Sequence, residues 1–302
     1  MRALVTGGCG FIGSHLVRRL LADGVDVSII DDLTTGSRRN IAGLEARLIY
    51  ASIEDRAALR EALEGVETVY HLAAMVSVPM SLKRPATCLR TNVVGTAGVL
   101  EEARSEGVST VVFASSAAVY GDSDDGVQRE GAPSRPSSPY GVSKRSGEQL
   151  CEIFDGPGLR TVCLRFFNVY GPGQDPNSSY ASVVPAFASR AQHGEPIVIY
   201  GDGEQTRDFI QVADVVDAAV HCANDPTFRG IANVGTGLGV SVNQLARQIV
   251  ELCGSRSVLE HVPARDGDVR HSVAAVDRLR SSGWSPRYDL ESGLRATLGD
   301  YR

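Results

Sequence analysis

Apolar residues in the first half of the chain follow two alternating patterns. Short apolar runs, such as Ala3 to Thr6 and Val27 to Ile30, are typical of buried strands. Between these runs, apolar side chains recur every three or four residues, as at Ile12, Leu16 and Leu20, and this period is typical of an amphipathic helix. Continuous apolar strands separated by helices predict a parallel sheet that helices cover on both faces.

The two patterns also predict where the elements lie. Strands are expected at 3–6, 27–30, 47–50, 66–72, 110–114 and 160–165, and helices at 11–22, 57–63, 92–106 and 140–154. After about residue 168 the rhythm breaks, and a polar Gly/Pro loop at 171–179 precedes a helix at 183–193 and irregular elements. We therefore expect an α/β fold, with a doubly wound domain at 1–167. A smaller mixed α/β domain is expected at 168–302, with some chain returning to the first domain.

Composition and charge narrow the class of protein. Of the 302 residues, 43% are hydrophobic, so the chain can bury a core and does not have a disordered composition. The net charge of −6 argues against nucleic acid as a partner, because nucleic-acid-binding domains carry a basic face. No apolar run approaches the roughly 20 residues of a membrane span, and the N-terminus does not resemble a signal peptide.

The six cysteines are scattered along the chain and lack the paired spacing of a zinc site. Disulfides are rare in the reducing cytoplasm, where free cysteines are usually buried. We therefore expect a cytoplasmic protein with reduced thiols and no metal site.

A glycine-rich turn, TGGCGFIGS at 6–14, joins the first predicted strand to the first predicted helix. Gly7 permits the tight turn, Gly10 lets the backbone approach a pyrophosphate at the helix N-terminus, and Gly13 allows close helix–strand packing. Asp31 follows the second strand, where it can accept hydrogen bonds from the adenosine ribose and repel a 2′-phosphate. Together these features predict a Rossmann-type domain that binds NAD rather than NADP.

Tyr140 and Lys144 stand four residues apart on the predicted helix 140–154, so their side chains lie on one face. The positive charge of Lys144 is expected to lower the pKa of the Tyr140 phenol and make it a competent base at neutral pH. Ser115 and Ser116 follow a strand, where open α/β sheets build their sites, although serines there can also be capping residues. Both serines are therefore candidates for a catalytic hydroxyl, and the family resemblance described next implies Ser116 first and Ser115 second.

The glycine spacing, the Tyr-x-x-x-Lys pair and the serines resemble the extended branch of the short-chain dehydrogenase/reductase superfamily. Later motifs resemble its nucleotide-sugar branch, and most of all UDP-glucose 4-epimerases. These motifs are HLAA at 71–74, TNVVGT around Asn92, RFFNVYGPGQDPN at 165–177, GDGEQTRDFIQVADV at 201–215 and RDGDVRHS at 265–272. The resemblance covers nearly the whole chain. It implies NAD as cofactor and a catalytic role for Ser116, Tyr140 and Lys144.

The resemblance also assigns ligand-binding residues. It implies that NAD is bound by Gly7, Gly10, Phe11, Ile12, Gly13, Asp31, Asp32, Ser52, Ile53, Leu72, Ala73, Ala74, Asn92, Ser115, Tyr140 and Lys144. It implies that a UDP-sugar is bound by Ser116, Tyr140, Asn168, Val183, Val184, Val198, Tyr200, Arg207, Arg265, Asp268 and Ser272. Within this set, Asn168 and the two arginines suit the diphosphate, Asp268 the uridine ribose, and Tyr200 the uracil ring.

The residues after Ser116 separate related reactions. Nucleotide-sugar 4,6-dehydratases have an acidic pair there, and UDP-glucuronate decarboxylases keep the glutamate. This chain has Ala117 and Ala118, and neither side chain can move a proton. We therefore expect a UDP-hexose 4-epimerase. Tyr140 would take the C4 hydroxyl proton, the 4-keto sugar would rotate, and hydride would return on the opposite face.

Several alternatives remain open. Ser272 stands where some 4-epimerases have a tyrosine that restricts the sugar pocket, so an N-acetylated sugar is expected to fit, unless Ser272 is simply a strand residue. UDP-glucuronic acid is the rival substrate and a nucleotide-sugar 4-ketoreductase the rival enzyme. The non-enzymatic rival is an NAD-binding regulatory scaffold. The resemblance also implies a homodimer formed through helices 92–106 and 140–154.

Overall fold

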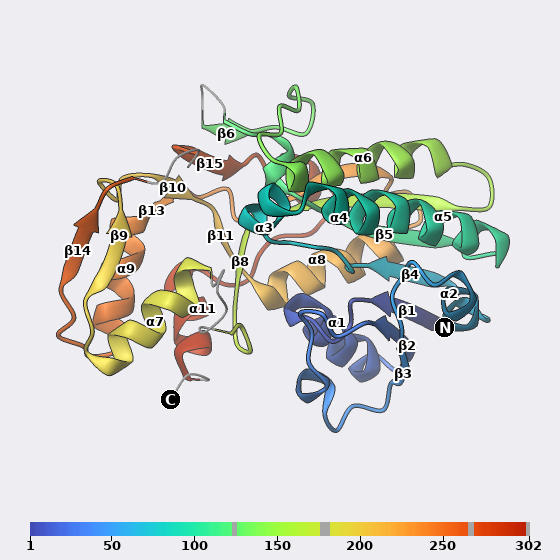
Figure 1. Cartoon of the computed structure of the whole chain (residues 1–302), viewed down its shortest axis with the longest axis horizontal. Helices are drawn as coiled ribbons and strands as arrows, with labels where there is room; N and C mark the ends of the chain where they lie inside the picture. The colour runs from blue at the N-terminus through green and yellow to red at the C-terminus, as the bar shows by residue number, and fades with distance from the viewer. Residues whose placement is uncertain (123–125, 176–181, 265–268, 300–302) are drawn as a thin grey trace. The chain divides into compact units, whose positions relative to one another are not determined.

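The computed structural model describes residues 1–122, 126–175, 182–264 and 269–299. The chain forms two compact units, each assembled from several segments (Figure 1). Unit 1 consists of Met1–Val119, Pro136–Arg165 and Val216–Ala232, and unit 2 of Tyr120–Arg135, Phe166–Val215 and Asn233–Arg302. Each unit therefore depends on segments that are far apart in the sequence.

Unit 1 is built on a seven-stranded sheet with the order β12-β7-β5-β4-β1-β2-β3. Its strands are β1 (Arg2–Thr6), β2 (Asp26–Asp31), β3 (Arg47–Tyr50), β4 (Thr68–His71), β5 (Thr110–Ser116), β7 (Arg160–Phe166) and β12 (Gly230–Val234). Strand β1 pairs in parallel with β2 on one side and with β4 on the other, so the strand order reverses at β1. Open parallel sheets bind ligands at the carboxyl ends of the strands beside such a reversal.

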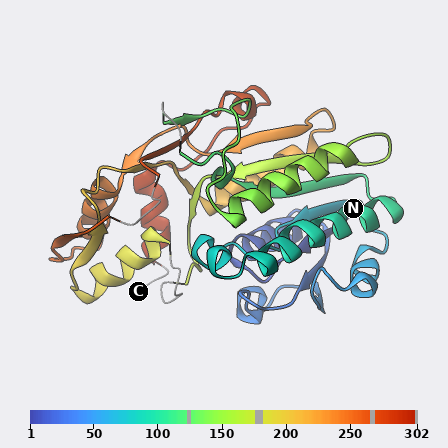
Figure 2. The same cartoon turned by 45° about the horizontal axis from the view of Figure 1, so that its top comes forward.

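Helices cover the sheet of unit 1 on both faces. They are α1 (Phe11–Ala22), α2 (Arg56–Leu63), α3 (Val78–Lys83), α4 (Pro85–Leu89), α5 (Gly95–Ser105), α6 (Pro139–Phe154) and α8 (Val212–Asn224), with a π-helix at Arg90–Val94 before α5 and 3₁₀ turns at Arg38–Ile41 and Ala117–Val119. Helices α5 and α6 run side by side on one face, while α1 and α8 lie behind the sheet (Figures 1 and 2).

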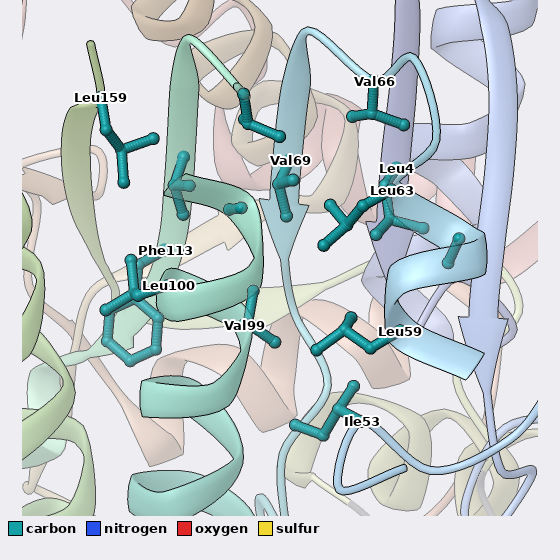
Figure 3. Close-up of a cluster of buried hydrophobic side chains, with 14 of the residues drawn as sticks. Leu4, Ile53, Leu59, Leu63, Val66, Val69, Val99, Leu100, Phe113 and Leu159 are labelled. Carbon is teal, nitrogen blue, oxygen red and sulfur yellow. The ribbon is translucent and has the colours of Figure 1, made fainter. Parts of the chain in front are cut away.

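One large apolar core fills the space between the sheet and the helices α2, α5 and α6. Figure 3 shows Leu4, Val69 and Phe113 from neighbouring strands pointing toward Leu59 and Leu100 from the helices, and all five are at most 1% exposed. Burial of such side chains contributes about 1.5–3 kcal/mol each. This core fixes the strands whose carboxyl ends carry the candidate site.

Helix α6 lies unusually close to the sheet because of a glycine. A Cβ atom added at Gly147 would lie 2.4 Å from the Cζ atom of Phe113 on β5, which is closer than real Cβ atoms come. Ser138 caps the N-terminus of α6, where its side chain accepts a hydrogen bond from the Gly141 N–H. The capped start and the close approach fix the position of α6 along β5.

Unit 2 contains three small sheets, with the orders β13-β10-β15-β6, β11-β8 and β14-β9. Its strands are β6 (Val127–Gln128), β8 (Asn168–Tyr170), β9 (Ile197–Tyr200), β10 (Thr206–Arg207), β11 (Phe209–Gln211), β13 (Val240–Ser241), β14 (Leu259–Val262) and β15 (His271–Ala274). Its helices are α7 (Val183–His193), α9 (Val242–Leu252), α10 (Asp277–Ser281) and α11 (Leu290–Leu298). Apolar side chains of α7, α9 and α11 form the core of this unit.

The structure confirms the predicted doubly wound parallel sheet and corrects three details. The sheet has a seventh strand, β12, which the sequence pattern did not predict because the apolar run in Gly230–Val234 is short. The predicted helix 92–106 is a π-helix followed by α5. Two short helices, α3 and α4, precede it. Within the described residues, no helix is both long and apolar enough to cross a membrane.

Candidate active site

The glycine-rich turn connects β1 to α1 in a form that side chains would prevent. Gly7 has a φ of +71°, and a Cβ atom there would lie 2.8 Å from the Ala73 nitrogen. A Cβ atom at Gly13 would lie 2.2 Å from the Gly7 carbonyl oxygen, so only glycine allows this approach of helix to turn. Gly10 is the N-cap of α1 and has no capping side chain. The first backbone N–H groups of α1 therefore suit an anion such as the pyrophosphate of NAD.

Asp31 ends β2 beside this turn, and its carboxylate is 7% exposed. One oxygen accepts a hydrogen bond from the Cys9 N–H and the other from the Leu33 N–H, both at 2.8 Å. Burial raises the pKa of Asp31, and these two hydrogen bonds oppose that rise. Each carboxylate oxygen can accept a second hydrogen bond, so the group fits the ribose hydroxyls of the adenosine. The neighbouring Asp32 is exposed.

The other predicted cofactor residues lie around the ends of β1, β3 and β4. The N–H groups of Leu72 and Ala73 donate to the Thr6 hydroxyl at 3.1 and 3.0 Å. The side chains of Phe11, Ile12, Ser52 and Ala74 are half-buried. Ile53 differs from this group, because its side chain belongs to the core of unit 1 and is 4% exposed. Its predicted contact with NAD would therefore have to use its backbone.

A buried histidine, to which the sequence motifs assigned no role of its own, joins the ends of these strands. His71 Nδ1 lies 2.7 Å from the Thr6 hydroxyl, and His71 Nε2 lies 2.9 Å from the Thr96 hydroxyl. The Thr96 hydroxyl donates to the Asn92 carbonyl oxygen, so it accepts from His71 Nε2–H. Burial and the nearby Lys144 charge lower the pKa of His71 to about 3. His71 is therefore a neutral imidazole that links β1, β4 and α5.

The three predicted catalytic side chains lie together in unit 1. The Ser116 hydroxyl, at the end of β5, is hydrogen-bonded to the Tyr140 phenol on α6. The Lys144 ammonium donates to the Ala114 carbonyl oxygen at 2.7 Å and lies 5.9 Å from the centre of the Tyr140 ring. Tyr140 is also held at its backbone, where its N–H donates to the Ser81 hydroxyl at 3.2 Å. With these contacts, the phenol oxygen of Tyr140 can exchange a proton with a substrate hydroxyl that binds beside it.

The pKa of Tyr140 differs from the prediction. Burial raises the pKa of the phenol, and the hydrogen bond from Ser116 is what opposes that rise. The predicted lowering by Lys144 is not seen, because the ammonium is bonded to the Ala114 carbonyl rather than to the phenol. Burial lowers the pKa of Lys144 itself to about 8. The chain alone therefore holds Tyr140 as a neutral phenol.

The other serine, Ser115, is bonded to a different residue of α6. Its hydroxyl donates to the buried Glu148 carboxylate at 2.6 Å, and its side chain is 3% exposed. Ser116 is thus the serine that meets Tyr140. Local spacing does not separate two adjacent serines at a strand end, and it was the family resemblance that ranked Ser116 before Ser115.

Asn92 stands in the π-helix before α5 and ties it to the candidate site. Its side-chain nitrogen donates to the Met75 carbonyl at 3.0 Å and to the Ser143 hydroxyl at 2.9 Å, and its oxygen accepts from the Met75 N–H at 2.8 Å. Single π-helical turns often occur at functional sites. Asn92 therefore fixes the segment after β4 next to α6.

In unit 2, two predicted substrate-binding residues lie side by side. Arg207 on β10 and Ser272 on β15 are partners in a parallel pairing, and both are half-buried. Asn168 begins β8, where it pairs with Phe209 and is half-buried. A guanidinium, an amide and a hydroxyl suit the polar groups of a nucleotide sugar.

A buried carboxylate that the sequence motifs did not single out holds the backbone around Arg207. Asp208 is 0% exposed and accepts hydrogen bonds from the Thr236 N–H and hydroxyl, the Gly237 N–H and the Ala274 N–H, at 2.7 to 3.1 Å. Burial raises the pKa of Asp208, and these hydrogen bonds oppose the rise. A charged residue directly before the apolar pair Phe-Ile in TRDFI was the available sequence signal.

Two predicted residues lie on β9. Val198 and Tyr200 are two residues apart on this strand, so their side chains share one face, and Tyr200 is 38% exposed. Strand β9 pairs with β14, which ends at Val262. Arg265 and Asp268, also predicted to bind substrate, lie outside the described residues.

Helix α7 carries the remaining pair. Val183 is half-buried, whereas Val184 is 1% exposed and packs in the core of unit 2. The side chain of Val184 is therefore unavailable to a ligand. Its predicted contact would have to come from its backbone.

The buried neutral state of His71 predicts a pH dependence of stability. The pKa is about 3 in the folded chain, against about 6.5 for a histidine exposed to water. Between these values the unfolded chain binds more protons, so the free energy of unfolding falls by up to about 1.4 kcal/mol per pH unit as the pH drops. His71→Gln should remove this contribution and make the fall less steep. Urea unfolding at several pH values measures the slope.

The matched control is His193→Gln, because His193 is exposed and lies on α7, in the other unit. The free energy of unfolding of His193→Gln should change with pH as steeply as that of the unsubstituted chain. Equal slopes for His71→Gln and the unsubstituted chain would mean that His71 is not held neutral.

Comparison with known proteins agrees with this geometry. Residues 3–235 match the NAD dependent epimerase/dehydratase family. The chain is 39% identical to the UDP-glucose 4-epimerase of Mycolicibacterium smegmatis, over 100% of the chain and 99% of the relative. A UDP-glucose 4-epimerase from Thermus thermophilus, solved with NAD, is 36% identical with a TM-score of 0.93, and the match covers 100% and 99% of the two chains.

Other relatives differ in substrate or reaction. A UDP-N-acetylglucosamine 4-epimerase from Methanobrevibacter ruminantium is 36% identical with a TM-score of 0.95, over 99% of this chain and 97% of that chain. MoeE5, solved with UDP-glucuronic acid and NAD, is 39% identical with a TM-score of 0.89, over 100% and 99%. The UDP-N-acetyl-alpha-D-glucosaminuronate decarboxylase of Bacillus cytotoxicus is 32% identical over 100% of this chain and 98% of the relative.

The family match at 3–235 includes the glycine turn and the Tyr-x-x-x-Lys helix, and the matches to the two UDP-glucose 4-epimerases cover the whole chain, unit 2 included. The fold, the motifs and the matches agree on the cofactor class, and solved structures similar to this chain hold NAD. The chain belongs to the NAD-dependent epimerase/dehydratase family of extended short-chain dehydrogenases/reductases.

Proposed function

We propose that the chain is an isomerase, a UDP-hexose 4-epimerase that uses bound NAD. Its substrates are UDP-glucose and UDP-galactose, and the N-acetylated pair is accepted as well. The observation that carries this proposal is the cluster of Ser116, Tyr140 and Lys144, with Ala117 and Ala118 next in the chain. The cluster can move a proton at one substrate oxygen, and the two alanines offer no second acid or base for elimination.

Residues of unit 1 hold the cofactor in this proposal. The uncapped N-terminus of α1 at Gly10 binds the pyrophosphate, Asp31 binds the adenosine ribose, and Lys144 contacts the nicotinamide ribose. Held there, NAD would supply a reversible hydride acceptor for C4 of the sugar.

Tyr140 carries the proton in both directions. In the oxidative half of the reaction Tyr140 acts as a phenolate, which has first lost its own proton to solvent, and it takes the proton of the C4 hydroxyl. In the reductive half the phenol formed in this way gives that proton back. The Ser116 hydroxyl is bonded to the phenol and opposes the rise in its pKa, and its single proton can turn from the phenol to the sugar oxygen. The Lys144 ammonium, held at the Ala114 carbonyl, adds positive charge near the oxygen that becomes negative.

Residues of unit 2 bind the nucleotide in this proposal. Asn168, Arg207 and Arg265 hold the diphosphate, while Asp268 binds the uridine ribose and Tyr200 covers the uracil ring. The backbone around Val183, Val184 and Val198 completes the uridine side. Anchoring the nucleotide end leaves the 4-keto sugar free to turn over before it is reduced.

The direct experiment offers the protein a panel of UDP-sugars without added reductant and identifies the products by NMR. The panel contains UDP-glucose, UDP-galactose, UDP-N-acetylglucosamine and UDP-glucuronic acid. Inversion at C4 without net NADH consumption supports the proposal. Turnover that requires NADH points to a 4-ketoreductase, and binding of NAD without any turnover points to a regulatory scaffold.

UDP-glucuronic acid is the second candidate substrate. The similarity to MoeE5, which was solved with UDP-glucuronic acid and NAD, favours it. Ser77, Ser115 and Ser116 are the hydroxyl donors that could serve its carboxylate. In unit 1 the Ser115 hydroxyl already donates its proton to Glu148. The Ser77 hydroxyl accepts from the Met80 N–H as the N-cap of α3, so its own proton stays available to a carboxylate. The same panel decides between the two substrates.

Tyr140→Phe should lower the turnover number about 10²- to 10⁴-fold, because the variant lacks the oxygen that carries the proton. NAD binding should stay within a few-fold, as measured by titration. Tyr70→Phe is the matched control: the buried Tyr70 hydroxyl has no hydrogen-bond partner among the described residues. Turnover by Tyr140→Phe at the rate of the control would refute the catalytic assignment.

Ser272→Tyr tests the proposed room for an N-acetyl group. The larger side chain, next to Arg207 across the β10–β15 pair, should lower the rate on UDP-N-acetylglucosamine relative to UDP-glucose by about tenfold or more. Competition between the two substrates measures this ratio directly. An unchanged ratio would mean that Ser272 does not limit the sugar pocket.

We further propose that two copies associate through α5 and α6. Val94, Val142 and Ile153 on this side of unit 1 are 64%, 42% and 76% exposed, which is unusual for apolar side chains on neighbouring helices. A second copy of the same surface would bury them as a four-helix bundle. Sedimentation should give a dimer, and Ile153→Glu should weaken it. A monomer at micromolar concentration would contradict this.

A further inference from the structure

A fully buried ion pair lies directly behind the predicted catalytic residues. The Glu148 side chain on α6 is 0% exposed, and the Arg165 side chain near the end of β7 is 1% exposed. Arg165 Nε donates to one carboxylate oxygen at 2.7 Å and Arg165 Nη2 to the other at 2.8 Å. This is the fork-shaped, two-bond arrangement that fixes both direction and distance.

Two further donors complete the shell of this carboxylate. The Ser115 hydroxyl donates to the first oxygen at 2.6 Å, and Arg145 Nη1 donates to the second at 3.1 Å. The four hydrogen bonds use the acceptor capacity of Glu148. A buried pair that is satisfied in this way is costly to disturb at one partner, because the other charge is then left without compensation.

The pair also completes a regular pattern between α6 and β5. Tyr140, Lys144 and Glu148 follow one another at intervals of four residues, so they form a single stripe along the helix. Three consecutive residues of β5 bond to this stripe. The Ala114 carbonyl accepts from Lys144, Ser115 donates to Glu148, and Ser116 is bonded to Tyr140.

We propose that Glu148, through Ser115 and Arg165, is the positioning residue that holds Tyr140 and Lys144 against Ser116. The two hydrogen bonds from Arg165 hold the Glu148 carboxylate at β7. The bond from Ser115 to the same carboxylate holds α6 at β5. The proposal rests on the proposed hydride-transfer function of this site, because it concerns how that triad is kept in register. A misplacement of about 1 Å in such a site can cost about a hundredfold in rate.

Glu148 also acts on Lys144 through its charge. Burial lowers the pKa of Lys144 to about 8, and the charges of Cys88, Cys151 and Glu148 oppose that fall, in decreasing order. The other ionisable or charged groups around Lys144 are Cys88 on α4, His71 on β4, Tyr140 and Cys151 on α6, and Arg165 behind Glu148. Loss of the Glu148 charge should therefore deprotonate Lys144 at lower pH.

The test compares the pH profiles of variants. Glu148→Gln should lower kcat about tenfold to a hundredfold with KM changed less than threefold, and the alkaline limb of the profile should move to lower pH. Ser115→Ala keeps the buried pair and loses only the bond to β5. It should lower kcat about threefold to tenfold and leave the alkaline limb in place. Arg145→Gln, which removes a bond from a half-exposed side chain, is the control and should stay within twofold.

The outcomes distinguish a role of Glu148 in positioning Tyr140 and Lys144 from a role in stabilising the fold alone. If Glu148→Gln melts at lower temperature but keeps its kcat and its alkaline limb, the proposal is overturned. If Glu148→Gln does not fold, Ser115→Ala decides, and an unchanged kcat in that variant overturns the proposal.

A measurement that needs no activity separates this inference from the proposed function. The folded Lys144 has a pKa of about 8, against 10.5 for a lysine exposed to water, so the unsubstituted chain should gain stability as the pH rises through that window. In Glu148→Gln the gain should begin at lower pH. If the unsubstituted chain turns over no UDP-sugar, the proposed function fails, and this stability profile still tests the link between Glu148 and Lys144.

Discussion

The hydrogen bonds between the end of β5 and one stripe of α6 are the constraint on which the candidate site depends. Ala114, Ser115 and Ser116 each bond to a different residue of the stripe. They reach it because Gly147 lets α6 approach Phe113 more closely than any side chain would allow. The apolar core under α2, α5 and α6 holds the strand in place (Figure 3). The carboxyl end of β5 is therefore held by the apolar core, by the close contact with Gly147 and by three hydrogen bonds to α6.

Both units contain buried charges, which are costly unless each group is satisfied. Glu148 and Arg165 satisfy one another, and the Lys144 ammonium rests on a backbone carbonyl. Asp31 is held by two backbone N–H groups, and Asp208 in unit 2 by three such groups and a hydroxyl. These shells are formed by the chain itself. They leave the geometry of the site set before any ligand arrives, as electrostatic catalysis requires.

Local patterns in the sequence predicted the features that local spacing decides. The glycine turn with Asp31, the helical spacing of Tyr140 and Lys144, and the bounds of α1, β3 and α7 were all readable from short windows. Features that depend on distant segments were not. The partners of His71 and Glu148 come from other strands and helices, and the edge strand β12 lies within the irregular second half of the chain. The raised pKa of Tyr140 reflects burial, which no spacing encodes.

The most direct test of transient oxidation at C4 uses a UDP-hexose labelled with deuterium at that carbon and incubated in ordinary water. A hydride that leaves and returns within the site stays on the sugar. Transient oxidation therefore predicts that the 4-epimer keeps the label at C4 while no label appears in the solvent. Loss of the deuterium to water during epimerisation, or a product changed at another carbon, would contradict it.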